Sequence, residues 1–193
     1  MIGNIKIKVK YFNLVLLLCF PLLAIASPVI DNRNGYNFTK NIGPFKFYRK
    51  LDFKDPRLGY GLNYRTSGGI KQRSIVTIII YDLGMKNITA GISDQRVIKQ
   101  FENAFRDIKT FVSRGNYKSV KRLDQSSVKN KDYLALNMLI TIPRGLTLKS
   151  NILMRGHNGK FIKIRISGPN NAESDKLALT VLKQISLILG LKR

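Results

Sequence analysis

Histidine and cysteine, two side chains that often act in catalysis and metal binding, are scarce in this chain. It has one histidine, His157, and one cysteine, Cys19, among 193 residues. A zinc site needs three or four His, Cys or carboxylate ligands, so we expect no metal and no other cofactor. A Ser-His-acid triad could use only His157, and the sequence has no Gly-x-Ser-x-Gly turn to expose a serine.

Carboxylates are the remaining candidates for acid–base chemistry, and the chain has 11 of them against 34 lysines and arginines. Asp52 and Asp55 lie close together in the sequence, and Asp82 and Asp94 flank a loop. A glycosidase places two such acids across a cleft. We expect most of these acids to pair with lysine or arginine and therefore favour a protein that is not an enzyme. A small hydrolase that uses Asp82 or another loop acid is the alternative.

Asp82 also has a structural interpretation, because the apolar run that ends at Tyr81 stops abruptly there. An aspartate can accept hydrogen bonds from backbone N–H groups just ahead of it, and Gly84 permits a left-handed backbone step. We therefore predict that Asp82 and Gly84 form a structural turn at the exit of a central strand. Gly159 is predicted to serve a second turn.

The strongest functional signal is the positive charge. The formal net charge is +23, and the 31 basic and 11 acidic residues that follow Ala26 leave +20. Such an imbalance favours anionic partners. The expected partners are anionic lipid, an anionic envelope polymer or an acidic protein, whereas nucleic acid is not expected for an exported chain. An assembly factor that binds a protein partner is a further alternative.

Five basic residues are candidates for anion binding. They occupy strand positions opposite or between apolar residues: Arg49, Arg65, Arg155, Lys163 and Arg165. If their strands adjoin, they form one positive face of a sheet, together with Phe161 and nearby tyrosines. An ordinary solvated sheet face would produce the same pattern and is the alternative.

Residues 1–26 have the pattern of a cleaved signal peptide. Three lysines precede an uncharged apolar run of 13 residues, which ends in Ala24-Ile25-Ala26. This order of segments is typical of secretory signals, and the run is short for a membrane span, which needs about 20 residues. We expect a periplasmic or secreted protein with no transmembrane span in the mature chain; an uncleaved N-terminal anchor is the alternative. Residues 27–44 are expected to be a flexible lead-in and residues 45–193 a single domain.

Hydrophobic periodicity predicts an α+β fold. Alternating apolar residues predict strands over 45–53, 58–64, 117–123, 134–142, 148–154 and 162–166. The apolar run 74–81 predicts a central strand covered on both faces. Helical spacing predicts two helices, from Asp94 to Gly115 and from Ala172 to Gly190. Short turns indicate a mostly antiparallel sheet of about six to seven strands, with the two helices packed on it in an α/β/α-sandwich-like arrangement.

The register of the last hairpin depends on the length of its turn. A two-residue Asn-Gly turn would place charged residues opposite Ile152 and Met154. A three-residue turn over 157–159 would instead pair Met154 with Ile162 and keep the apolar residues on one face. We expect the three-residue turn, whose outward face would carry Asn151, Leu153, Arg155, Phe161, Lys163 and Arg165.

The order of these elements resembles the PsbP-like superfamily, which includes small bacterial envelope proteins of the DcrB type. The resemblance rests on the segments LGYGLNYR (58–65), IVTIIIYDLG (75–84) and GKFIKIRIS (159–167), together with the two helices. It covers residues 45–190 and implies an antiparallel sheet sandwiched by helices. It implies no catalytic residue, and because its members do different things, the fold does not transfer a function.

Overall fold

The structure, a computed structural model, describes residues 29–69, 71–123 and 132–191 of the chain. The predicted signal segment, residues 1–26 with Cys19, lies outside these ranges. The helices are α1 (Gln95–Ser113) and α2 (Ala172–Ile188), and two short 3-10 turns are η1 (Arg33–Gly35) and η2 (Pro56–Leu58). The strands are β1 (Val29–Asp31), β2 (Phe38–Thr39), β3 (Asn41–Ile42), β4 (Phe45–Asp52), β5 (Tyr60–Arg65), β6 (Ile75–Tyr81), β7 (Ser119–Leu123), β8 (Leu134–Thr141), β9 (Thr147–His157) and β10 (Lys160–Pro169).

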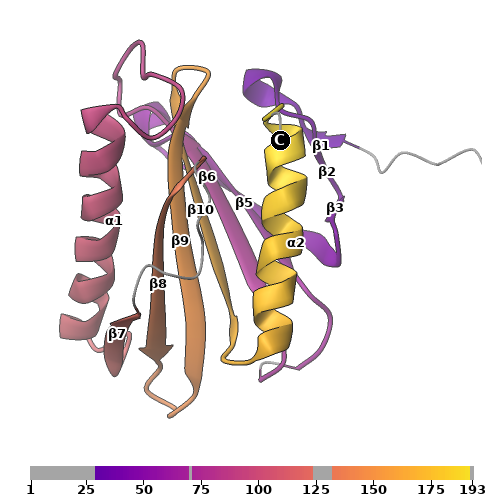
Figure 1. The fold of residues 1–193 in the computed structure, drawn as a ribbon, viewed down its shortest axis with the longest axis vertical. Helices are drawn as coiled ribbons and strands as arrows, with labels where there is room; N and C mark the ends of the chain where they lie inside the picture. Colours follow the sequence, from indigo (N-terminus) through magenta and orange to yellow (C-terminus); the bar gives the residue numbers. More distant parts are fainter. Residues whose placement is uncertain (1–28, 70, 124–131, 192–193) are drawn as a thin grey trace, which may run out of the picture.

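Eight of these strands form one sheet in the order β3-β4-β5-β6-β10-β9-β8-β7, and all of its neighbouring strands are antiparallel (Figure 1). β1 and β2 form a small second sheet. The prediction of an α+β fold with a large antiparallel sheet and two helices is confirmed. The sheet contains more strands than predicted, partly because the short β3 lies in a segment that was expected to be loose.

Both helices begin at residues whose side chains cap them. Asp94 accepts a hydrogen bond from the backbone N–H of Arg96 at 2.9 Å, and Asn171 accepts one from the N–H of Ser174 at 2.9 Å. Beyond α1 the chain turns at Gly115, whose φ of 73° suits a glycine. Within the described ranges, neither helix is long and apolar enough to cross a membrane.

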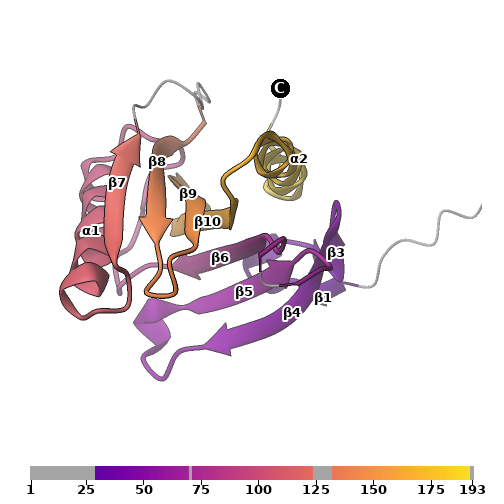
Figure 2. The same ribbon diagram turned by 90° about the horizontal axis from the view of Figure 1, so that it is seen from below.

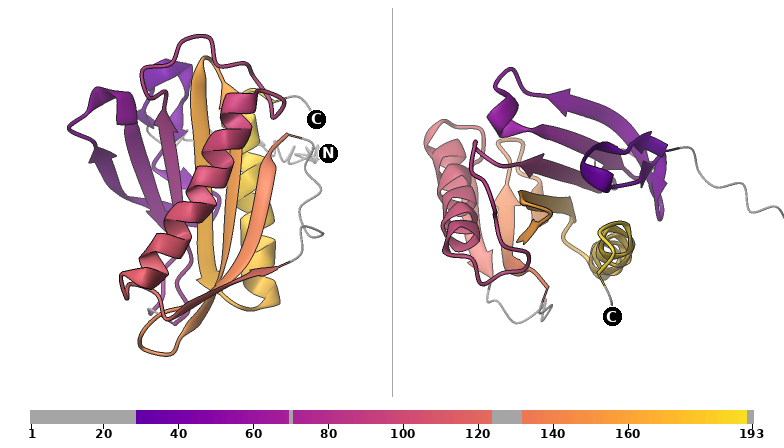
Figure 3. Two further views of the ribbon diagram at one scale, coloured as in Figure 1. Left: turned by 90° about the vertical axis from the view of Figure 1, so that its left-hand side faces the viewer. Right: turned by 90° about the horizontal axis from the view of Figure 1, so that it is seen from above.

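The two helices lie on opposite faces of the sheet, which separates two apolar cores (Figures 2 and 3). α1 packs on β7 and β9 and buries Val97 in one core; α2 packs on β10 and β3 and buries Val181 in the other. In the central strand β6, Ile78 is buried on the α2 face and Ile79 is half-buried on the α1 face. The prediction that this strand is covered on both faces is therefore confirmed.

Residues 29–44 belong to the folded structure, so the expectation of a flexible lead-in does not hold for them. β1 pairs with β2, and β3 pairs with β4. Tyr36, Phe38 and Ile42 are at most 2% exposed and lie in the α2-side core. The expectation failed because the segment is rich in Asn and Gly, while its apolar anchors are few and irregularly spaced.

The β9–β10 hairpin has a two-residue turn, so the predicted three-residue turn is wrong. Asn158 and Gly159 have φ values of 47° and 69°, and positive values at both positions are typical of a type I′ turn. Met154 therefore pairs with Lys163 and not with Ile162. Gly159 does adopt the left-handed conformation that was predicted for it.

The predicted register assumed that only one face of this hairpin is buried. Both faces are buried, because Leu153 lies in the α2-side core while Ile152 and Met154 lie in the α1-side core. The predicted outward face therefore does not exist. Alternation along the strands places Asn151, Leu153 and Arg155 on the α2 face, and Phe161, Lys163 and Arg165 on the α1 face.

Candidate anion-binding site

Four of the five basic candidates lie on the sheet face that α1 packs against. Arg49 of β4 pairs with Asn63 of β5, which pairs with Thr77 of β6. Thr77 pairs in turn with Arg165 of β10. With strands about 4.8 Å apart, the backbones of Arg49 and Arg165 lie roughly 14 Å apart. A row of polar residues therefore crosses the sheet on this face.

Arg65 and Lys163 share this face, because each lies two residues from a member of the row. The exposed ring of Tyr48 lies beside the row: the guanidinium carbon of Arg65 is 4.0 Å from the ring centre, and that of Arg49 is 5.9 Å from it. Both distances suit cation–π contacts. We call Arg49, Arg65, Lys163 and Arg165 the basic face.

Arg155 lies on the opposite sheet face and is only 6% exposed, so it is not part of the basic face. Its Nη1 lies 3.9 Å from Oδ1 of Asp132, and its guanidinium carbon lies 5.4 Å from the ring centre of Tyr133. Phe161 is on the α1 face but fully buried, with its ring centre 5.2 Å from that of Tyr81. The prediction that these two residues join one accessible face is therefore wrong.

Within the described part of the chain, no carboxylate lies within 4.0 Å of a basic-face cation. Seven aspartates form ion pairs there, and their partners are Arg33, Lys50, Arg57, Arg96, Lys149, Arg155 and Lys160. These acids therefore neutralise cations elsewhere, and the four cations of the basic face carry a surplus of positive charge.

A cavity of about 200 Å³ lies between the basic face and α1. Lys163 and Arg165 line it from β10, and Thr77 lines it from β6. The wall on the α1 side is formed by Ala104, Asp107, Ile108 and Phe111.

The two cations of the cavity are held differently. Arg165 donates hydrogen bonds from Nε to Oγ of Ser150 at 3.0 Å and from Nη2 to the hydroxyl of Tyr117 at 3.1 Å, which fix its guanidinium. Burial lowers the pKa of the Lys163 amine, although the charge of Asp107 opposes this shift. Because a bound anion would favour the charged amine, the cavity suits an anionic group.

The carboxylate of Asp82 makes structural contacts. It accepts hydrogen bonds from the N–H of Gly84 at 2.7 Å and from Nζ of Lys160 at 2.5 Å, and Gly84 has a φ of 76°. The carboxylate of Asp82 thus makes the backbone contact expected for a turn, and Lys160 is an additional partner. The hydrogen bond from Lys160 lowers the pKa of Asp82, whereas a general acid needs a raised pKa.

Among the described residues, the side chain that contacts the His157 ring belongs to Tyr36 and not to a serine or a carboxylate. Nδ1 of His157 lies 2.9 Å from the hydroxyl of Tyr36, a neutral group, and burial lowers the pKa of His157. The described residues also contain no group of three or more His, Cys, Asp or Glu side chains that could hold a metal ion.

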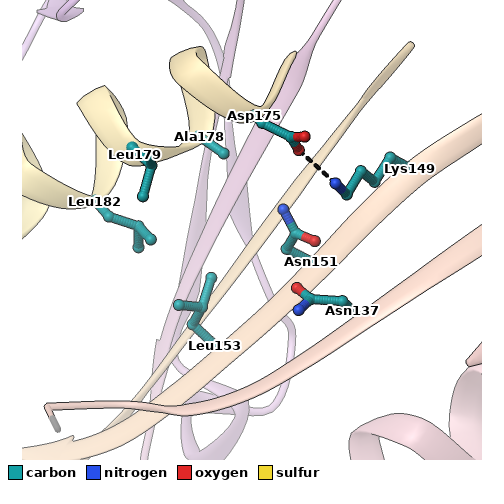
Figure 4. Close-up of a pocket in the computed structure, with 8 residues that line it drawn as sticks. All are labelled: Asn137, Lys149, Asn151, Leu153, Asp175, Ala178, Leu179 and Leu182. Carbon is teal, nitrogen blue, oxygen red and sulfur yellow. Dashed lines mark ion pairs between the residues drawn. The ribbon is translucent and has the colours of Figure 1, made fainter. Parts of the chain in front are cut away.

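A second pocket of about 200 Å³ lies on the other side of the sheet, beneath α2 (Figure 4). At its edge, Nζ of Lys149 and Oδ1 of Asp175 form an ion pair at 2.6 Å, and the amides of Asn137 and Asn151 lie below them (Figure 4). Among the described lining residues, the single lysine is thus already paired with the single aspartate. This pocket has no surplus positive charge and fits an anion less well than the cavity beside α1.

Three residues that lie beside the basic face were not among the candidates from the sequence, namely Tyr48, Asn63 and Thr77. The pairing register shifts between Phe47 and Arg49. Such a bulge lets Tyr48 face the same side as Arg49, against simple alternation. The sequence did hold one signal for Asn63 and Thr77: each is a polar residue within a largely apolar strand.

No protein-family model matches this chain, and neither a curated protein nor a solved structure matches it. The chemistry of the site is therefore inferred from its own residues.

Proposed function

We propose that this protein is an exported, non-enzymatic envelope protein that binds an anionic partner through the basic face. The carrying observation is that four cations lie on one sheet face with no carboxylate within 4.0 Å among the described residues. Clustered charges of one sign create a local potential that attracts a ligand of opposite sign.

A linear polymer with repeating phosphate or carboxylate groups fits this face better than a flat membrane surface does. The cations extend roughly 14 Å across the sheet, and α1 stands on the same side (Figure 3). A flat layer of lipid headgroups would meet α1 first, whereas a flexible chain of charges can follow the sheet beside the helix. The exposed ring of Tyr48 adds a surface for stacking.

Export rests on the signal pattern of residues 1–26 and makes an envelope polymer the preferred partner class. The resemblance to the PsbP-like superfamily is part of the proposal, and the position of the sheet between two helices supports it. The hydrolase alternative is weaker, because Lys160 and Gly84 occupy the carboxylate of Asp82.

Binding of a linear polyphosphate, followed by fluorescence anisotropy, tests this proposal. The double variant Arg49→Gln/Arg65→Gln removes two charges from the basic face. The matched control Lys176→Gln/Lys183→Gln removes two charges from exposed positions of α2. The two double variants therefore have equal net charges. We expect the first to weaken binding about tenfold or more, because contacts to the polyanion are lost, and the control to bind like the wild type.

Salt dependence provides a second measurement. If four phosphates are neutralised, the wild-type affinity should fall roughly fifty-fold between 50 and 200 mM salt, by the counterion release of a single-stranded polyanion. Equal losses in the two double variants would contradict a specific face. Tighter binding to vesicles of anionic lipid than to polyphosphate would reassign the face to membranes.

A further inference from the structure

We propose that the cavity between α1 and β10 binds one small amphipathic anion, a carboxylate with a compact aromatic body. Its charged end would lie on Lys163 and Arg165, and its ring would lie against α1. This inference rests on the proposed function in one respect, since both use cations of the basic face. The cavity, however, excludes Arg49 and Arg65, so the two sites can be tested separately.

The lining of the cavity combines charged and apolar side chains. Lys163 and Arg165 lie two residues apart on β10, about 7 Å along the strand. The apolar part consists of Ile108 and Phe111 on α1, and of Ile79 on β6 and Ile152 on β9, the strands next to β10. An inorganic anion would leave this apolar surface unfilled, and an apolar molecule would leave the cations without a counter-charge. An amphipathic anion satisfies both, because charged groups need a partner when water is removed and apolar surface gains from its removal.

The volume of the cavity limits the size of the ligand. An engineered cavity of about 150 Å³ lined by apolar side chains is known to bind benzene. The present cavity of about 200 Å³ therefore has room for a benzene ring with a carboxylate attached. A longer ligand, such as a lipid with two acyl chains, would not fit inside it.

The geometry of the cations suits a carboxylate. The hydrogen bonds of Arg165 to Ser150 and Tyr117 hold its guanidinium in place before a ligand arrives, which reduces the entropy lost on binding. Asp107 of α1 lines the same cavity and has no ion-pair partner within 4.0 Å among the described residues. Its charge opposes a bound anion, and the ligand must therefore place its carboxylate toward β10.

Titration of the full-length protein with benzoate, followed by isothermal calorimetry and by NMR chemical shifts, tests the inference. Benzyl alcohol has the ring without the charge, and acetate has the charge without the ring. We expect benzoate to bind at least about tenfold more tightly than either, because charge-assisted hydrogen bonds and ring burial both contribute.

Three variants test whether the ligand binds in this cavity. Lys163→Met keeps a long unbranched side chain without the charge and should weaken benzoate binding about tenfold. It should fold because it removes a charge that burial disfavours. Asp107→Asn should strengthen binding several-fold. Ala104→Leu fills the cavity from α1, where Ala104 is 5% exposed, and should abolish benzoate binding while polyphosphate binding remains. Thermal unfolding confirms that each variant is folded.

The outcomes separate this inference from the proposed function. Arg49→Gln/Arg65→Gln should lose polyphosphate binding and keep benzoate binding. Absence of benzoate binding to the wild type, or equal affinities for benzoate and benzyl alcohol, would overturn the cavity assignment alone. Benzoate binding that survives both Lys163→Met and Ala104→Leu would place the ligand elsewhere and overturn it too. If benzoate binds as expected but polyphosphate does not, only the polymer proposal fails.

Discussion

At the scale of single residues, the neighbours of a charge decide whether it serves the fold or remains available to a ligand. Lys160 and Lys163 lie on the same strand, β10. Nζ of Lys160 contacts the carboxylate of Asp82 at 2.5 Å. Among the described residues, Lys163 has no carboxylate within 4.0 Å. The first lysine fastens the turn after β6, and the second leaves its charge on the basic face.

Asp82→Asn should lower the free energy of unfolding by about 1 kcal/mol, because it removes the ion pair to Lys160 and weakens the turn. The pKa of Asp82 is lowered in the folded state, so this stabilisation is present above the unfolded pKa and is lost as the pH falls through the folded pKa. Urea unfolding of the two proteins should differ at neutral pH and converge in acid. Loss of polyphosphate binding in a folded Asp82→Asn protein would contradict its purely structural role.

At the scale of elements, a two-residue turn decides which side chains β9 and β10 bring together. The left-handed conformations of Asn158 and Gly159 set the register that pairs Met154 with Lys163. A slip by one residue would move the side chains of a strand to the other face. The register therefore places Lys163 and Arg165 beside α1 and sends Arg155 to the other core.

Gly159→Ala should destabilise the protein by about 1 kcal/mol, because an alanine is strained at a φ of 69°. An added Cβ would meet no atom within 4 Å, so the effect is one of backbone conformation alone. Gly69→Ala is the matched control, since it also adds a Cβ in open space but at a backbone conformation outside the left-handed region. Urea denaturation measures both, and equal destabilisation would contradict the turn's role.

At the scale of the whole molecule, the sheet separates two cores, and residues 29–44 help to build the α2-side core. Phe38 is fully buried there, while Val29 in the same segment is 52% exposed. The fold therefore depends on a segment whose composition resembles a linker. The basic face lies on the other side of the sheet, so changes in this segment should act on stability more than on binding.

Phe38→Ala should lower the free energy of unfolding by about 3–5 kcal/mol, the usual cost of removing a buried aromatic side chain. Val29→Ala should change it by less than about 0.5 kcal/mol, because this side chain is exposed. Chemical denaturation compares the two variants. Small effects of both would show that residues 29–44 are a loose lead-in after all.

The sequence by itself determined the α+β class, the helix starts at Asp94 and Ala172, the turn at Asp82 and the set of basic residues. These features are local, since capping, periodicity and turn chemistry depend on neighbouring residues. Only the tertiary structure decided that Arg49 and Arg165 share a face, that Arg155 does not, and that a cavity opens beside α1. Those outcomes depend on strand pairing and helix packing between segments far apart in the chain, for which local periodicity holds no information.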